Sequence, residues 1–532
     1  MTDGEAHADT ASLTGGEAAA RRGSYGAGLG HGAFSFVSGA LIALLTSVIV
    51  ARLYGVRVIG EYALAAAPAG AVWLLSTVRE QPALMRRLTP LQPRDPRVTG
   101  LFAAVLAFST ALTACVSLLA GLLTWLLFNG PIDHPELIAP AEAMLAASLL
   151  FVNTCWNLDT VLGAFRAGRP LLTCRMHQAL MYLALSVALS FVLPNVWGLI
   201  VAWYASWATS LLQRLASCRA FMRLRVDRGE LRKGFATLPE LLRFGLALTP
   251  GFLAEGVSDE AGTWILGAVA AVPTIGAYNR AWTIARRGLE LNYRVTEMLF
   301  PTLVERRLGE DHAGFDRALV DSLRYTAIAM LLPAAVAAGA AVPIMSIYGP
   351  GFAAGSGAFA FLVFVPGIVT LSGVQSQALI ADGRAARASL YGLARAVATL
   401  LAAVLLARAD GLRGVGAGML IGACAQLVPL SASLPRLLGS AFSELLRPRE
   451  AISLLSAGTT GFLMARLLSA ALSHPLALLL APTLGLAAAA AVFIAIGGVQ
   501  PRDRARARGL IRAFGARLSF ASGRPRGSSG RT

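Results

Sequence analysis

Six charged residues lie within one otherwise apolar stretch of the sequence, residues 276–303. They are Arg280, Arg286, Arg287, Glu290, Arg294 and Glu297. In an α-helix, where successive residues are about 100° apart, all six fall within one arc of about 120° and the opposite arc is apolar. The pattern predicts an amphipathic helix with a charged stripe of net positive charge, which is a surface suited to holding an anion.

The cost of exposing this stripe to lipid indicates what it must face. A charge at the centre of a bilayer costs at least about 2.5–3.5 kcal/mol, so six would cost roughly 15–20 kcal/mol together. The stripe must therefore face water or other charges. Glu290 is four residues from both Arg286 and Arg294 and can pair with either. Arg280 and Arg287 have no evident partner on the same helix.

Three acids precede the stripe in the stretch 244–269: Glu255, Asp259 and Glu260. Two interpretations of these acids remain open. In one, they form salt bridges with the arginines and stabilise the fold. In the other, they bind a coupling proton or sodium ion, as intramembrane carboxylates often do.

The same choice, between a salt-bridge network and an anion-binding cavity, applies to the arginines. Arginine suits phosphate because its planar guanidinium donates two parallel hydrogen bonds. We favour the cavity for Arg280, Arg287 and Arg294, with Arg286 and Glu290 beside them. Arg395 and Arg52 are further cavity candidates, for which a structural role and a position at the head groups are the alternatives.

The sequence predicts no metal or cofactor site. The five cysteines lie in or beside apolar stretches and lack the paired spacings of zinc sites. A GxxxxGK[ST] motif is absent, so ATP hydrolysis by that route is not expected. We therefore expect no cofactor.

Membrane-spanning helices must position these residues. Of the 532 residues, 56% are hydrophobic and 14% charged, against about 25% charged in a typical soluble domain. A membrane-crossing helix needs about 20 mostly apolar residues. Fourteen stretches are candidates, although Pro68 weakens the second, three acids weaken the seventh and six charges weaken the eighth. They are 28–50, 59–78, 99–128, 138–163, 171–193, 197–217, 244–269, 276–303, 325–348, 357–380, 388–407, 414–438, 451–472 and 476–498.

The basic residues predict the orientation of the chain, because cytoplasmic connections are enriched in Arg and Lys. With the N-terminus inside, the outside connections carry only Arg52, Arg57, Arg408 and Arg413. The net charge of +17 is then a topology signal and a contact with anionic lipid, not a nucleic-acid site. We expect a multi-pass protein of the plasma membrane with both termini in the cytoplasm.

Short motifs recur in the two halves of the chain, at nearly the same spacing. Ile59-Gly60-Glu61-Tyr62 recurs as Ile275-Gly276-Ala277-Tyr278, Arg166-Ala167-Gly168-Arg169 as Arg384-Ala385-Ala386-Arg387, and Gly198 as Gly414. These matches map spans 1–6 onto spans 7–12, with chance similarity as the alternative. Because six is even, both halves have the same orientation, which is a common transporter plan with a binding site between the halves.

The spans and the repeat predict six segments. They are a disordered cytoplasmic tail (1–27), an N-lobe with spans 1–6 (28–220), a basic cytoplasmic linker (221–243), a C-lobe with spans 7–12 (244–440), spans 13 and 14 (451–498) and a basic cytoplasmic tail (499–532).

Several of these segments resemble one known family. Ala51-Arg52-Leu53-Tyr54-Gly55, followed by Ile59-Gly60-Glu61-Tyr62-Ala63-Leu64-Ala65, resembles the opening of polysaccharide exporters of the MOP superfamily. Arg243-Phe244-Gly245 and Phe300-Pro301 resemble parts of its second half, and Tyr348-Gly349-Pro350-Gly351-Phe352 resembles a short outside loop. The resemblance implies an all-α fold with two parallel six-helix lobes around a central cavity, plus two peripheral helices.

The resemblance also implies a function. We expect a flippase, not an enzyme, that moves a polyprenyl-pyrophosphate-linked oligosaccharide across the membrane by alternating access. Its partners would be this glycan, membrane lipids and proteins of polysaccharide synthesis, with no nucleic acid. The alternatives are an ion-coupled multidrug exporter of the same superfamily, in which the acids would dominate, and a lipid II flippase.

Overall fold

The computed structural model describes residues 15–500 and residue 503, apart from 79, 166, 224, 226, 247–248 and 439–447. This part of the chain forms helices and contains no strand. The elements are α1 (Gly15–Leu75), α2 (Glu80–Leu88), α3 (Pro96–Phe128), η1 (Pro135–Leu137), α4 (Ile138–Ala147), η2 (Ser148–Val152), α5 (Asn153–Ala164), α6 (Gly168–Ser190), α7 (Val196–Cys218), α8 (Arg228–Leu246), α9 (Thr249–Val269), α10 (Val272–Ala285), α11 (Arg287–Leu308), α12 (His312–Gly339), α13 (Ala341–Ser346), η3 (Pro350–Gly355), α14 (Ser356–Leu362), α15 (Val365–Ala381), α16 (Ala385–Leu438), α18 (Pro448–Ala471) and α19 (His474–Ala495).

Eight stretches of the described chain are long and apolar enough to cross a membrane. Two of them, Leu41–Leu75 and Ala386–Leu438, contain a backbone break, and each holds two of the predicted spans. The remaining predicted spans are α6, α7, α9 and the pair α10–α11, whose polar residues lower their hydropathy. The predicted all-α polytopic fold is confirmed, and the segment boundaries stay predictions.

The breaks in the two long helices are made by glycine. Gly55 in α1 has φ 78° and ψ 169°. In α16, Asp410 is followed by Gly411 at φ 51°. A residue with a Cβ atom is strained at positive φ, whereas glycine is not. Each break therefore allows the chain to reverse direction between two spans with almost no connecting loop.

The apolar cores show how the two halves of the chain meet. One buried cluster takes Ile59 and Leu64 from α1 and Ile275 and Tyr278 from α10, all of them 0% exposed. A second cluster belongs to α2, α3, α5, α7 and α8, and a third to α11, α12, α15 and α16. The halves therefore share a core near the Gly55 break and have separate cores farther from it.

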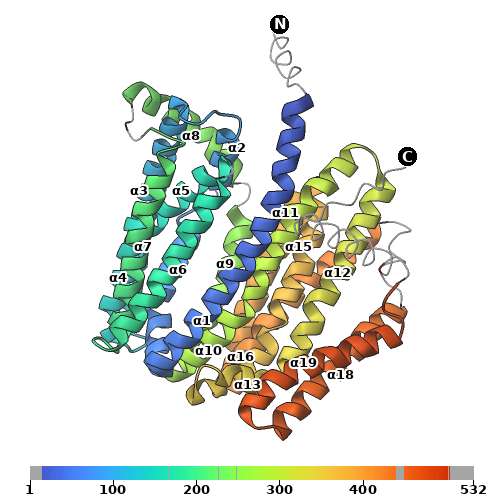
Figure 1. Ribbon diagram of the computed structural model, residues 1–532. Helices are drawn as coiled ribbons and strands as arrows, with labels where there is room; N and C mark the ends of the chain where they lie inside the picture. The colour runs from blue at the N-terminus through green and yellow to red at the C-terminus, as the bar shows by residue number, and fades with distance from the viewer. Residues whose placement is uncertain are drawn as a thin grey trace, which may run out of the picture.

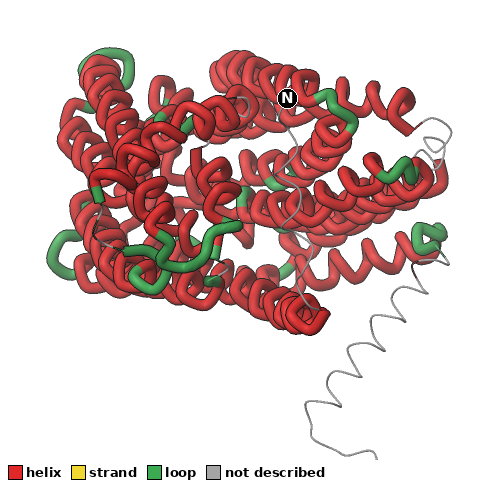
Figure 2. Tube along the Cα trace, turned by 90° about the horizontal axis from the view of Figure 1, so that it is seen from above, coloured by secondary structure: helices red, strands yellow, loops and turns green. Residues whose placement is uncertain are grey.

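The arrangement of the helices agrees with these cores. In Figure 1, α2–α8 lie on one side and α9–α16 on the other, with α1 between them. The two groups come together at the lower end and diverge toward the upper end, where both termini lie; Figure 2 looks along the helices from that upper end. We call the lower end the outer end and the upper end the inner end, after the topology that the sequence predicts.

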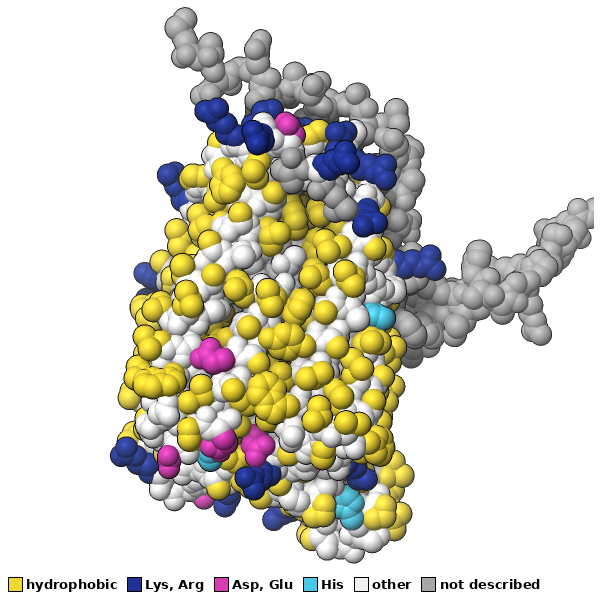
Figure 3. Space-filling view, turned by 90° about the vertical axis from the view of Figure 1, so that its left-hand side faces the viewer, with side chains coloured by type: hydrophobic (Ala, Val, Ile, Leu, Met, Phe, Trp, Pro, Cys, Tyr) yellow, Lys and Arg dark blue, Asp and Glu magenta, His cyan; other side chains and the backbone are white. Residues whose placement is uncertain are grey.

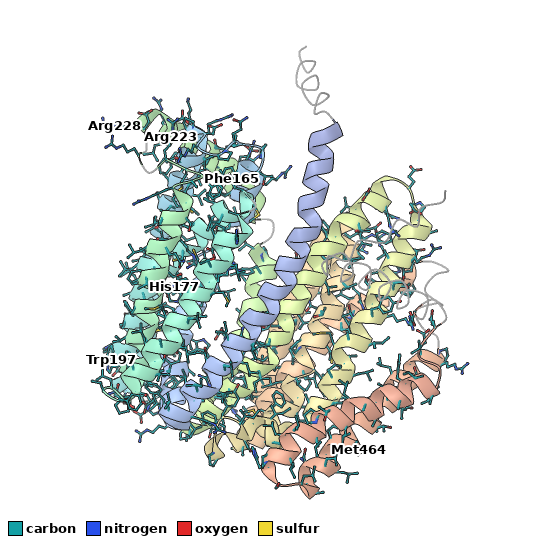
Figure 4. The ribbon with its side chains drawn as sticks, in the orientation of Figure 1. Phe165, His177, Trp197, Arg223, Arg228 and Met464 are labelled. Atoms are coloured by element: carbon teal, nitrogen blue, oxygen red, sulfur yellow. The ribbon has the colours of Figure 1, made fainter. Side chains whose placement is uncertain are left out.

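Helices α18 and α19 form a peripheral pair. They pack against each other, and both contact α12, so they lie on the edge of the second half and not between the halves. On the face of the first half, hydrophobic side chains cover the middle, and Lys and Arg gather most densely at the inner end (Figure 3). Arg223 and Arg228 lie at the inner end and Trp197 at the outer end (Figure 4). This surface fits a bilayer between two polar ends.

Candidate functional site

The charged stripe predicted for residues 276–303 is divided between two helices. Helix α10 ends at Ala285, Arg286 is its C-cap, and α11 begins at Arg287. Of the six charged side chains, Arg280 is buried, Arg286 is exposed, and Arg287 and Glu290 are half-exposed. The side chains of Arg294 and Glu297 lie outside the described residues. The stripe therefore contains one buried cation and, beyond the break, charges that reach open space.

Arg280 is buried among hydroxyl groups. Arg280 is only 8% exposed, and its Nη1 donates a hydrogen bond of 2.8 Å to Ser47 Oγ on α1. Ser47 Oγ lies 3.4 Å from the hydroxyl of Tyr348. The hydroxyls of Tyr62 and Tyr182 lie within electrostatic range of the guanidinium. Among the described contacts, Arg280 has no ion pair, and its Nε has no hydrogen-bond partner.

Arg287 pairs with Glu290, which the sequence did not predict. The Nη1 of Arg287 lies 2.6 Å from Oε1 of Glu290, and the two side chains are 40% and 39% exposed. Because α11 begins at Arg287, this pair spans the first turn of a new helix and Glu290 does not reach back to Arg286. The exposed Arg286 leaves this region with net positive charge.

The acids of α9 have different surroundings. Asp259 Oδ1 lies 2.9 Å from Nη2 of Arg395 on α16, and the Arg395 side chain is only 4% exposed. The carboxyl group of Glu260 lies against Gly70 of α1, where an added Cβ atom would be 3.3 Å from Glu260 Cδ. The structure therefore brings Asp259 and Arg395 together within the second half and places Glu260 at the boundary with the first half. Glu255 lies one turn before Asp259 on the same helix.

Arg52 joins the two halves at the outer end. Its Nε donates a hydrogen bond of 2.7 Å to the backbone oxygen of Ile347, which follows α13. The side chain is exposed. It lines a pocket of about 700 Å³ at this end, together with Gly55, Tyr348 and His474.

One buried ion pair was missed at the sequence level. Arg214 is 2% exposed, and its Nε donates a hydrogen bond of 2.7 Å to Oδ1 of Asp159. Its Nη1 donates to Gln178, and its guanidinium lies over the ring of Trp207. Arg214 lies inside α7, within the predicted span 197–217, and no spacing along the chain pointed to its partner Asp159 on α5. The presence of an arginine within an apolar span was the signal that could have found it.

A separate apolar cavity lies away from the charged stripe. Its volume is about 1180 Å³, and it is lined by α12, α14, α15, α16 and α18. Arg413 and Arg466 are its charged lining residues. It lies between the second half and the peripheral helices, so it does not include the residues of α10 and α11.

Comparisons with known proteins give the family and the fold. The model of a family described as "Polysaccharide biosynthesis protein" matches residues 49–351. A solved structure titled "Lipid II flippase MurJ, inward closed conformation" has a TM-score of 0.69, is 10% identical, and the match covers 88% of this chain and 98% of that one. The inward-facing structure of a multidrug resistance MATE family transporter of the MOP superfamily has a TM-score of 0.55 and 15% identity, over 77% of this chain and 95% of that one. No curated protein matches. At these identities the structural matches show the fold alone, which this chain shares with both of those proteins.

Proposed function

The chain belongs to the polysaccharide biosynthesis protein family, whose model matches residues 49–351, and on this premise we propose that it is a flippase for a lipid-linked glycan. The cargo is a polyprenyl-pyrophosphate-linked oligosaccharide or a related precursor. The protein binds the pyrophosphate and sugar between its two halves while the lipid chain stays in the bilayer. The MOP superfamily fold and the helical membrane architecture support a transporter over an enzyme.

The observation that carries this proposal is the buried guanidinium of Arg280 without an acidic partner among the described contacts. Removing a charge from water costs several kcal/mol unless a counter-charge compensates. A bound anion supplies that counter-charge, and arginine holds phosphate oxygens with two parallel hydrogen bonds. The exposed Arg286, at the break between α10 and α11, adds positive charge along the same path.

Alternating access follows from the division of the core. The halves share one buried cluster at the outer end and have separate clusters toward the inner end. A rotation about the shared cluster changes the separation of the inner ends without disrupting either separate core. We propose that this rotation exposes the site alternately to the two faces.

The acidic residues of α9 favour a flippase over a multidrug exporter, in which acids would dominate the binding cavity. Asp259 is paired with Arg395 within the second half, so it adds no net negative charge to the site. We therefore place any ion coupling at Glu260, which lies at the boundary between the halves, with Glu255 five residues and Asp259 one residue away on α9. The fold itself is shared by a lipid II flippase and a drug exporter, so the choice of cargo depends on the residues of the site.

The test is lipid analysis of a strain that lacks the protein. Mass spectrometry of extracted lipids should show one polyprenyl-pyrophosphate glycan accumulating, and wild-type protein should remove it. Arg280→Gln and Arg287→Gln should fail to do so, whereas Arg408→Gln, at the exposed outer end, should complement. A lipid profile that stays normal, together with new sensitivity to cationic drugs, would replace the flippase by a drug exporter. Accumulation of lipid II would identify a peptidoglycan cargo.

We also propose that the protein lies in the plasma membrane with both termini in the cytoplasm, because the basic side chains gather at the inner end (Figure 3). In intact cells, Trp197→Cys should react with a membrane-impermeant maleimide and Arg228→Cys should not. Peptide mass spectrometry distinguishes these sites from the native cysteines. The reverse pattern would invert the topology.

A further inference from the structure

The recurring sequence motif makes a reciprocal contact between the two halves. A Cβ atom added at Gly60 would overlap the carbonyl oxygen of Val272, and one added at Gly276 would overlap the carbonyl oxygen of Val56. In the repeat, Val56 and Gly60 occupy the positions of Val272 and Gly276, because both segments read Val-x-x-Ile-Gly-x-Tyr. The two contacts are therefore related by the approximate two-fold symmetry of the repeat. We call these four residues the outer clasp.

The outer clasp brings two helix backbones directly together. Small residues permit such an approach, and Cα–H groups then contact carbonyl oxygens across the crossing. The flanking Ile59 and Ile275 are both 0% exposed, so no water separates the halves here. In a helix, the carbonyls of Val56 and Val272 already accept the N–H groups four residues later. Separating the clasp therefore leaves no backbone group without its hydrogen bond.

Two arginine hydrogen bonds bracket the clasp and also cross between the halves. Toward the outer surface, Arg52 donates to the oxygen of Ile347 at 2.7 Å. Toward the membrane interior, Arg280 donates to Ser47 at 2.8 Å. Ser47 Oγ also donates a hydrogen bond of 3.4 Å to the hydroxyl of Tyr348 in the second half, so the apolar clasp and three hydrogen bonds together close the outer end.

We propose that the outer clasp is the external gate of the transporter and that Arg280 controls its release. An anion bound by the guanidinium of Arg280 takes up its free Nε–H and competes with Ser47 for Nη1. Losing the bond from Arg280 to Ser47 removes one of the three polar links across the clasp, so the halves separate more easily at the outer end. This role for Arg280 rests on the proposed function, whereas the gate itself is tested without any substrate.

Hydrogen–deuterium exchange of the full chain in lipid nanodiscs tests the gate. Gly60→Leu and Gly276→Leu place a side chain where the opposite backbone lies. Each should raise exchange about tenfold or more in peptides 50–62 and 272–282, because separation of the halves lets water reach helical amides that the closed interface keeps buried. Gly39→Leu is the matched control on α1, because nothing lies within 4 Å of the position that its Cβ would take, and it should leave exchange unchanged.

Peptides at the inner end distinguish an opened gate from an unfolded protein. Exchange in α2 and α8 should stay the same or fall when the outer end opens. A rise in exchange at both ends would show that the leucine variants are misfolded, so they would no longer support the gate. The milder variants Gly60→Ala and Gly276→Ala must then raise exchange at the outer end alone. Unchanged outer peptides in all four variants would refute the gate.

Inorganic pyrophosphate tests the role of Arg280. In the wild-type protein it should raise exchange in the two outer peptides, and in Arg280→Gln it should have no effect. Ser47→Ala should raise outer exchange without pyrophosphate, because it removes the acceptor while leaving the charge. If the glycine variants open the outer end but pyrophosphate does not, anion binding at Arg280 does not control the opening of the clasp. The lipid analysis would still decide the proposed function separately.

Discussion

Two buried arginines, one in each half of the chain, have opposite surroundings. In the first half, Arg214 is 2% exposed and its charge is met by Asp159, with Gln178 as an additional acceptor. In the second half, Arg280 is 8% exposed and is met by the hydroxyl of Ser47. Removing Asp159 would leave the charge of Arg214 buried without a partner, whereas Arg280 already lacks an acidic partner among the described contacts. We therefore propose that an anion binds at Arg280 and not at Arg214.

The largest expected effect concerns stability of the first half. Asp159→Asn leaves the buried Arg214 without a counter-charge, and breaking a buried pair costs about 3–5 kcal/mol. The thermal unfolding midpoint of the purified protein should fall accordingly. Arg175 also contacts Asp159, at 3.5 Å, but its side chain is 60% exposed. Arg175→Gln is therefore the control and should cost less than about 1 kcal/mol. Equal losses in the two variants would contradict the assignment of Arg214 as the structural partner.

A smaller loss is expected at the pair in the second half. Asp259→Asn removes the partner of Arg395, but the Asp259 side chain is 25% exposed, so water can partly replace it. We expect a loss of about 2–3 kcal/mol, and Asp259→Asn combined with Arg395→Met should recover most of it. A double-mutant cycle by thermal unfolding measures the coupling. Without coupling, Asp259 would become a free carboxylate and return as a candidate for ion binding.

At Arg280 we expect a loss of anion affinity without a loss of stability, in contrast to the two ion pairs. Arg280→Gln removes a buried charge that lacks an ion pair, so the unfolding midpoint should stay the same or rise. Affinity for pyrophosphate should fall about ten- to a hundredfold, the equivalent of about 1.4–2.8 kcal/mol. Isothermal titration of the purified protein measures this affinity, with Arg408→Gln as the control. A variant that unfolds easily and binds normally would assign Arg280 to the scaffold, like Arg214.

The sequence was most informative where one helix or one loop carries the signal. The apolar stretches predicted the membrane fold, the grouping of Arg280, Arg286 and Arg287 predicted a charged face, and the Ile-Gly-x-Tyr motif marked the repeat. These features depend on spacing along the chain, which periodicity describes directly.

The sequence could not predict which charges pair. Asp259 and Arg395 lie on helices far apart in the chain, and their contact depends on how α9 and α16 pack. The break at Arg286 likewise changed the partner of Glu290, because it restarted the helix at Arg287. Arg214 and Asp159 likewise lie on different helices, α7 and α5, so their pairing also depends on packing. Each error concerns packing between helices or the position of a helix end, which the apolar pattern does not specify.

The smallest effect is expected where the peripheral helices join the second half. Arg324 Nη2 lies 2.6 Å from Oδ2 of Asp503, and Tyr325 donates to the same carboxyl group. The Arg324 guanidinium holds the pKa of Asp503 well below its ordinary value. A lowered folded-state pKa contributes stability that is present above the ordinary pKa, near about 4, and is lost as the pH falls through the lowered value.

Asp503→Asn should therefore weaken the docking of α18 and α19 by about 1–2 kcal/mol at neutral pH. Exchange in peptides of α18 should rise in this variant at pH 7 and should approach that of the wild type only when acid protonates Asp503. If both proteins show the same exchange in α18 at pH 7, the carboxyl group of Asp503 does not hold the peripheral helices. Their attachment then depends on the salt bridge of 3.1 Å from Arg324 Nε to Glu450 on α18 and on the apolar contact with α12.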